Sequence, residues 1–191
     1  MFEKNLPAHF GGIPANTDFR IWIQIETTLL NVSLDASSRM AQALLLAFGD
    51  DIPTDVEGAV NWLIWFYRCG GRDTAPKDSK GKPTNEVYSY EHDAEYIYGA
   101  FMEQYGVDLY AADLHWWKFR AMFKSLQQDC QFVKIMGYRS MEIDGKMSKE
   151  MQAHYREMKR VYALPIPEGE KKRRDKIIEA LKNGGDVAGV L

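Results

Sequence analysis

The chain has 191 residues, which corresponds to one domain or to one domain with a tail. Hydrophobic residues make up 46% and charged residues 27% of the sequence, the balance of a globular protein, so extended disorder is not expected. The formal net charge of −3 shows no basic excess. It therefore argues against binding to nucleic acid or to a membrane surface.

The two cysteines, Cys69 and Cys130, are too few for a disulfide framework and form no CxxC motif, so we interpret both as reduced core residues. The N-terminus lacks the basic start and the apolar run of a signal peptide. The apolar stretch from Trp62 to Tyr67 is far shorter than the about 20 residues that span a bilayer. These features predict a protein of the cytoplasm that is neither exported nor anchored.

Residues 1–16 contain prolines and glycines and are predicted to form a loop-like arm. Either Thr17 or Asp18 can cap a helix over residues 19–30. This segment is ambiguous, because residues 19–26 alternate apolar and polar side chains as a strand does, whereas other apolar side chains fit helical spacing. We predict a helix, since no other segment offers a convincing partner strand.

Residues 35–48 are predicted to form a second helix that ends at Gly49, because Ala and Leu favour helices. A third helix follows, with Thr54 and Glu57 as a capping box and Gly70-Gly71 as its C-terminal stop. This third helix is apolar on most sides, which is typical of an element at the centre of a core.

Residues 72–87 are the longest polar stretch and are predicted to form a mobile loop. A fourth helix is expected after this loop, with Ser89 as its cap and Tyr105 near its end. Acidic side chains near its start are interpreted as a solvated first turn that the helix dipole favours: Glu91, Asp93 and Glu95.

The second half of the chain predicts three more helices. Residues 114–126 form the first, with Asp113 as its cap; Asp129 caps a short one that Gly137 stops, and Ser148 caps the last. Apolar side chains of that last helix recur at i, i+4, i+7 and i+11: Met151, Tyr155, Met158 and Tyr162.

Together these segments predict an all-α fold, a single compact bundle of six or seven helices, either with or without a separate C-terminal helix. We expect an N-terminal arm over residues 1–16 and a helical domain over residues 17–164. A charged tail, helical or flexible, is expected over residues 165–191. The sequence shows no internal repeat of fixed period and no βαβ rhythm.

Motifs of catalysis are missing from the sequence, which has no phosphate-binding fingerprint, no HExxH and no nucleophile elbow. His92 and Glu95 give one histidine–carboxylate pair at helical spacing, too few ligands for a zinc or di-iron site. The basic residues 171–174 have acidic neighbours, so they are interpreted as a solvated helix. We therefore expect no metal, no cofactor and no enzymatic activity, although a triad assembled in space stays open.

The segment from Leu114 to Arg120 is the first candidate for partner binding. Adjacent Trp116 and Trp117 point about 100° apart on a helix, so a small domain cannot easily bury both. Either both belong to the core, or one is partly exposed beside Arg120 and anchors a partner, as Trp and Arg do in binding hot spots. The second candidate is a methionine-rich stripe that either fills the core or contacts a partner: Met151, Tyr155 and Met158.

Four segments of the sequence form a recognisable set: Asn16–Arg20, Tyr88–Ala94, Leu114–Phe119 and Tyr138-Arg139. Together they resemble the phage gene-product-fifteen family of Gram-positive phages and prophages. The resemblance covers the chain from Asn16 to Tyr162. It assigns no functional residues, and the tail after Pro165 falls outside it.

The resemblance implies a place in phage tail assembly, because genes of this family typically lie between those of the major tail protein and the tape-measure protein. It suggests a chaperone that covers the helical tape-measure protein in the cytoplasm of an infected or lysogenic bacterium. A helix-in-groove mode would suit this partner. Two alternatives stay open, a structural tail or connector component of the virion and an unrecognised helical enzyme. A homo-oligomer is a further option.

Overall fold

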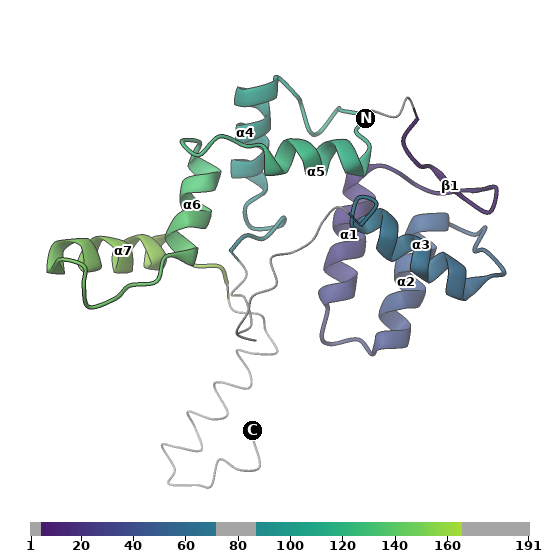
Figure 1. Cartoon of the computed structure of the whole chain (residues 1–191), viewed down its shortest axis with the longest axis horizontal. Coiled ribbons are helices and arrows are strands. Elements are labelled where there is room, and N and C mark those ends of the chain that lie inside the picture. The colour runs from purple at the N-terminus through teal and green to yellow at the C-terminus, as the bar shows by residue number, and fades with distance from the viewer. Residues whose placement is uncertain (1–4, 72–86, 166–191) are drawn as a thin grey trace, which may run out of the picture. The chain divides into compact units, whose positions relative to one another are not determined.

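The computed structural model describes residues 5–71 and 87–165, and the described chain is predominantly helical, as the all-α prediction requires (Figure 1). It divides into two compact units, residues 1–140 and 141–191. The helical domain predicted over residues 17–164 includes residues of both units. The buried hydrophobic side chains of the described chain end at Ile135, in the first unit.

In the first unit a short hairpin precedes the helices. The described elements are β1 (His9–Phe10), β2 (Ile13–Pro14), α1 (Phe19–Leu30), α2 (Ala36–Phe48), α3 (Val56–Tyr67), α4 (Ala94–Tyr105), α5 (Trp116–Lys124) and α6 (Gln131–Ser140). The predicted loop at residues 72–87 lies outside the described residues except for Val87. No helix of the described chain has the length and apolar character needed to cross a bilayer.

The predicted N-terminal arm forms structure of its own. Gly11 and Gly12 both have positive φ angles, which let the chain turn back so that β1 and β2 pair antiparallel. The side chains of Phe10 and Ile13 pack against the core of the first unit. The described part of this arm is therefore an integral part of the unit.

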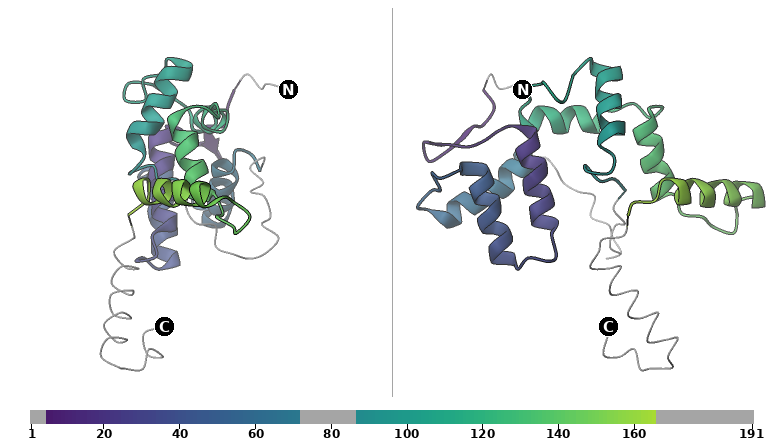
Figure 2. Two further views of the ribbon diagram at one scale, coloured as in Figure 1. Left: turned by 90° about the vertical axis from the view of Figure 1, so that its left-hand side faces the viewer. Right: turned by 180° about the vertical axis from the view of Figure 1, so that it is seen from behind.

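Helices α1 and α2 lie side by side in both views of the ribbon (Figure 1, Figure 2). The carboxylate of Asp18 accepts a hydrogen bond from the backbone N–H of Arg20, and Asp35 caps α2 in the same way. Trp22 and Ile25 of α1 are fully buried. The helical interpretation of residues 19–30 is thus confirmed, because tertiary burial of this face outweighs the strand-like alternation.

The third helix begins one residue later than the predicted capping box requires. Asp55, rather than Thr54, is the N-cap, and its carboxylate accepts a hydrogen bond from the N–H of Gly58 at 2.9 Å. The predicted stop is confirmed, because Gly70 has a positive φ angle and its N–H donates to the carbonyl of Trp65.

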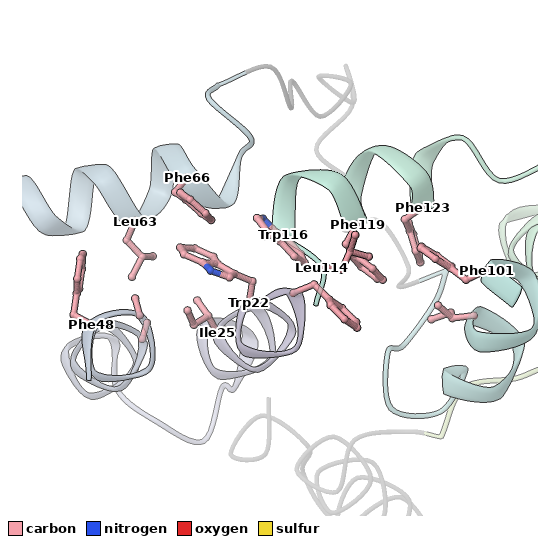
Figure 3. Packing of buried hydrophobic residues seen from close by; sticks show 14 of the residues in the cluster. Trp22, Ile25, Phe48, Leu63, Phe66, Phe101, Leu114, Trp116, Phe119 and Phe123 are labelled. Atoms are coloured by element: carbon pink, nitrogen blue, oxygen red, sulfur yellow. The ribbon is translucent and has the colours of Figure 1, made fainter. Parts of the chain in front are cut away.

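A continuous row of aromatic side chains forms the core of the first unit (Figure 3). Trp22 stacks on Phe66 with ring centroids 4.3 Å apart, and on Trp116 at 6.3 Å. Phe119 continues the row, 5.9 Å from Trp116 and 5.2 Å from Phe101 of α4. Each such pair contributes about 0.5–1.5 kcal/mol beyond the burial of apolar area. The row therefore joins α1, α3, α4 and α5 into one core.

The start of α4 differs from the prediction of a solvated turn capped by Ser89. The helix begins at Ala94, and the preceding residues form a turn in which the N–H of Ser89 donates to the Asp93 carboxylate. Asp93 is only 1% exposed and forms an ion pair with Arg139 of α6. A buried carboxylate needs such a cationic partner, so this residue ties α4 to α6 instead of facing solvent.

The N-cap of α5 is His115 and not the predicted Asp113. The Nδ1 atom of His115 accepts a hydrogen bond from the N–H of Trp117 at 3.1 Å. Backbone hydrogen bonds on both sides of this cap join the segment to the start of α1: Phe19 N–H to the Leu114 carbonyl, and Trp116 N–H to the Thr17 carbonyl. The starts of α1 and α5 are therefore fixed to each other.

The sixth helix continues through Gly137 to Ser140, so the predicted stop at this glycine is wrong. In the second unit the described helix is α7 (Lys149–Val161), and the predicted cap is confirmed, because the Ser148 hydroxyl accepts a hydrogen bond from the N–H of Met151. The predicted charged tail lies outside the described residues after Pro165.

Candidate partner-binding surface

The two adjacent tryptophans of α5 are held by the C-terminal end of α3. The indole N–H of Trp116 donates to the Tyr67 carbonyl at 3.0 Å, and that of Trp117 donates to the Phe66 carbonyl at 2.8 Å. Trp116 is fully buried and Trp117 is half-buried. Trp116 is therefore a core residue, and its predicted role as a partner contact has to be corrected, since it has no exposed surface.

Arg120 lies one turn further along α5 and belongs to a polar cluster under the helix surface. Its guanidinium carbon is 5.3 Å from the centre of the Trp116 ring, and Nη1 donates to the hydroxyl of Tyr90 at 3.4 Å. Burial raises the pKa of Tyr67 and of Tyr90, and the nearby Glu26 carboxylate raises both pKa values further. Arg120 therefore stabilises the interior, and it is half-buried.

The exposed tryptophan of this region is Trp65 of α3. It is 41% exposed, and its ring contacts Trp117 edge-on at 5.3 Å. The three tryptophans together explain why α5 carries two in succession. Trp116 fills the core and Trp117 fastens α5 to the end of α3, which leaves Trp65 at the surface.

The methionine stripe predicted from the sequence lies on α7, in the second unit. Met151 is 49% exposed, Tyr155 and Met158 are half-buried, and α7 has no buried residue. Basic side chains share the helix, among them Arg160, which forms an exposed ion pair with Glu157. The structure thus presents the predicted stripe at the surface of this unit and does not bring it into a core of the described residues.

A pocket between α1, α4 and α5 of the first unit was not anticipated from the sequence. We call it the Tyr110 pocket. It encloses about 210 Å³, and buried Phe19, Ile97 and Phe119 form its floor. Tyr98 and Tyr110 line its edge with ring centroids 5.0 Å apart, and Tyr110 is 77% exposed. An exposed aromatic ring beside an apolar hollow is a common feature of protein-binding surfaces.

Arg20 fixes the loop that carries Tyr110. Its Nη2 atom donates to the carbonyls of Leu109, Tyr110 and Ala112 at 2.6–3.1 Å, while Nη1 pairs with the Asp18 carboxylate at 2.8 Å. A charged donor shared among three carbonyls holds the backbone in one conformation. The sequence signal for this role is weak, because an arginine near a helix start is also compatible with a solvated side chain.

A second hollow of about 390 Å³ lies further along α4, where Gln104, Gln127 and Asp129 give it a polar lining. Gln104 bridges it with two hydrogen bonds, one to the Ser125 carbonyl and one from the Gln127 N–H. Among residues 5–71 and 87–165, no three His, Cys, Asp or Glu side chains are grouped as a metal site requires. The predicted pair His92 and Glu95 is exposed.

Comparison with protein-family models places this helical chain among bacteriophage proteins: residues 12–164 match the family described as Bacteriophage Gp15 protein. The chain belongs to this family, which confirms the resemblance found in the four sequence segments. Membership indicates a phage protein with a structural or tail-related role. Comparisons with curated proteins and with solved structures gave no match.

Proposed function

We propose that this protein is a tail assembly chaperone that binds the tape-measure protein of its phage and keeps it soluble until the tail tube forms around it. The observation that carries the proposal is the exposed apolar surface of a phage-family helical domain, centred on the Tyr110 pocket. A long amphipathic helix has an apolar face that aggregates unless another protein covers it. Covering such a face requires accessible apolar side chains, and the pocket has exposed Tyr110 beside half-buried Ile23 and Leu109.

The α7 stripe supports the same proposal from the second unit. A helix whose apolar side chains recur on one face, with basic residues beside them, can pack along another amphipathic helix. Methionine adapts its flexible side chain to partners of different shape. We therefore include Met151, Tyr155 and Met158 among the proposed partner contacts, together with the exposed edge of Trp117. Arg120 contributes by holding α5 in place.

Binding without catalysis is the second part of the proposal. The lining of the Tyr110 pocket is mainly apolar, and its arginine is already engaged by three carbonyls and a carboxylate, which suits binding of an apolar group better than proton transfer. We expect the protein to act in the bacterial cytoplasm during tail assembly and to be released afterwards.

Co-expression with the tape-measure protein of the same phage tests the proposal. We expect the tape-measure protein to remain in the soluble fraction and to co-purify with this chain, and to precipitate when it is expressed alone. A second measurement is mass spectrometry of purified virions. Stoichiometric amounts of this chain in the particles would assign it to the tail or its connector and would reject the chaperone role.

A further inference from the structure

We propose that the Tyr110 pocket receives one large apolar side chain from a helical segment of the partner, and that lysine or arginine residues flank this side chain. The inference rests on the proposed function and specifies the chemistry of the partner segment. Three features of the pocket carry it, namely its size, its fixed wall and the charge around it.

The size of the pocket suits a side chain. Small-molecule sites typically enclose about 300–1,000 Å³, whereas this pocket encloses about 210 Å³. The floor is formed by the buried side chains of Phe19, Ile97 and Phe119, so a group that enters meets an apolar surface. A leucine, methionine or phenylalanine side chain fits these conditions, because its burial needs no hydrogen-bond partner.

The wall of the pocket is fixed before a partner binds. Arg20 holds the carbonyls of the loop around Tyr110, and the Asp108 carboxylate accepts a hydrogen bond from the Tyr110 N–H at 2.9 Å. The Tyr98 ring supports the Tyr110 ring from one side. A preorganised pocket loses little conformational entropy on binding, so an inserted side chain contributes most of its burial energy to affinity.

The chain segment that supplies most of the pocket lining is acidic. Residues 87–117 contain six acidic residues and no lysine or arginine. Asp93 is neutralised by Arg139, but exposed Glu91, Glu95 and Asp108 are close in sequence to residues that line the pocket. The Asp18 carboxylate compensates the charge of Arg20. Arg120 donates to the hydroxyl of Tyr90 in the pocket, and the Glu26 carboxylate lies near this cation. Such a field attracts cationic segments and repels acidic ones.

A helix satisfies both conditions within one segment. Residues three and four positions apart lie on the same helix face, so a single turn presents an apolar anchor with a basic side chain beside it. Helices that bind apolar grooves commonly use this arrangement. The geometry of the pocket thus favours a basic amphipathic helix over an acidic one.

The test uses the full chain and a fluorescent model helix of about 20 residues, long enough to be stable, built from leucine and lysine in an amphipathic pattern. A second peptide carries glutamate in place of lysine. We expect the lysine peptide to bind and the glutamate peptide not to bind. Binding of both peptides with equal affinity would overturn the charge preference.

Matched variants locate the binding site on the chain. The substitution Ala94→Trp fills the pocket, and Ala121→Trp places the same side chain at an exposed position of α5 that does not line it. We expect the first to weaken binding at least about tenfold, as loss of a hot-spot contact does, and the second to leave it unchanged. Equal affinities for both would reject the pocket as the site.

A charge reversal keeps the test independent of pocket-filling effects. Glu95→Lys changes an exposed carboxylate next in sequence to Ala94 of the pocket, whereas Glu103→Lys makes the same change at the second hollow of α4. We expect Glu95→Lys alone to weaken binding of the lysine peptide. Circular dichroism confirms that each variant folds, and equal binding by the two would contradict the inference.

Two combinations of results distinguish failure of this inference from failure of the proposed function. If wild-type chain captures the tape-measure protein and the pocket variants capture it equally well, the pocket inference fails while the chaperone proposal stands. If the wild-type chain does not capture the tape-measure protein but still binds the lysine peptide through the pocket, the chaperone proposal fails while the pocket inference stands. Sedimentation of the wild type and the variants tests self-association. If the wild type self-associates, Ala94→Trp alone loses this association and no peptide binds, the pocket receives a second copy of the chain and the inference is overturned.

Discussion

Asp93 and Arg139 form a two-point ion pair in which Nη1 and Nη2 donate to the two carboxylate oxygens at 2.6 Å and 2.8 Å, although 46 residues separate them. The pair joins the N-cap residue of α4 to the last turn of α6. Arg139 also donates to the Val87 carbonyl, so the same side chain fixes the entry to α4. The start of α4, which the sequence predicted to be solvated, therefore links α4 to α6 through a buried carboxylate.

The first prediction concerns this ion pair. Asp93→Asn removes the negative charge and leaves a nearly buried guanidinium without its carboxylate, which should lower the free energy of unfolding by about 3 kcal/mol. Urea denaturation followed by tryptophan fluorescence measures the change. Glu95→Gln is the control, because this exposed neighbour should cost less than about 0.5 kcal/mol. Equal stability of the two variants would show that the pair contributes nothing.

The second prediction concerns pH. Burial lowers the pKa of His115 from its ordinary value of 6.5, and the hydrogen bond with the Pro7 carbonyl only partly opposes this. Because the folded-state pKa lies below that of the unfolded chain, protonation favours unfolding. The contribution of neutral His115 is thus complete above about pH 6.5 and is lost as the pH falls from there through the folded-state pKa.

His115→Asn tests this origin of the pH dependence. Asparagine can cap α5 as the imidazole does but has no proton to gain, so its stability should fall less than that of the wild type between pH 7 and pH 5. Thermal unfolding at several pH values gives the comparison. His115→Ala should lose about 1 kcal/mol at neutral pH through the missing cap. A wild type and an Asn variant with parallel pH profiles would exclude His115 as the source.

The third prediction separates the tryptophans. Trp116→Phe loses the hydrogen bond to Tyr67 and leaves a void in the core, which should cost about 2 kcal/mol of unfolding free energy. Trp65→Phe makes the same chemical change at an exposed position and should cost less than about 0.5 kcal/mol. Chemical denaturation distinguishes them. A larger loss for Trp65 would mean that it, and not Trp116, is the core residue.

The fourth prediction concerns α7. Met158→Ser shortens the apolar stripe and should reduce capture of the tape-measure protein several-fold, whereas Ala153→Ser in the same helix should leave it unchanged. Pull-down from co-expressing cells, quantified against the wild type, provides the measurement. Unchanged capture by Met158→Ser would remove the stripe from the proposed contact surface.

Local patterns predicted most helices of this fold. Residues 19–30 and 36–48 form helices close to the expected bounds, because caps such as Asp18 and a positive-φ glycine at position 49 act through nearby backbone groups. The errors occur where distant residues determine the local conformation. His115 replaces Asp113 as a cap because the α5 start is hydrogen-bonded to the α1 start, which no local pattern encodes.

The candidate surface was harder to predict than the fold. The sequence singled out the region around Trp116 and Trp117, but periodicity cannot tell which of two neighbouring rings is covered by another helix. The Tyr110 pocket combines three helices and a loop, so its existence depends on tertiary packing. Arg20 connects these parts through carbonyls about 90 residues away, as Nη2 reaches Tyr110, and backbone carbonyls leave no signature in a sequence.

The backbone junction between Thr17–Phe19 and Leu114–Trp116 has a consequence for synthesis on the ribosome. Helices α1 to α3 emerge first, yet Trp22 lacks its Trp116 neighbour until α5 has been made. A nascent chain that ends before α5 therefore exposes an aromatic face and unpaired amides. Limited proteolysis of stalled chains should show protection of the N-terminal helices appearing abruptly once α5 has left the exit tunnel.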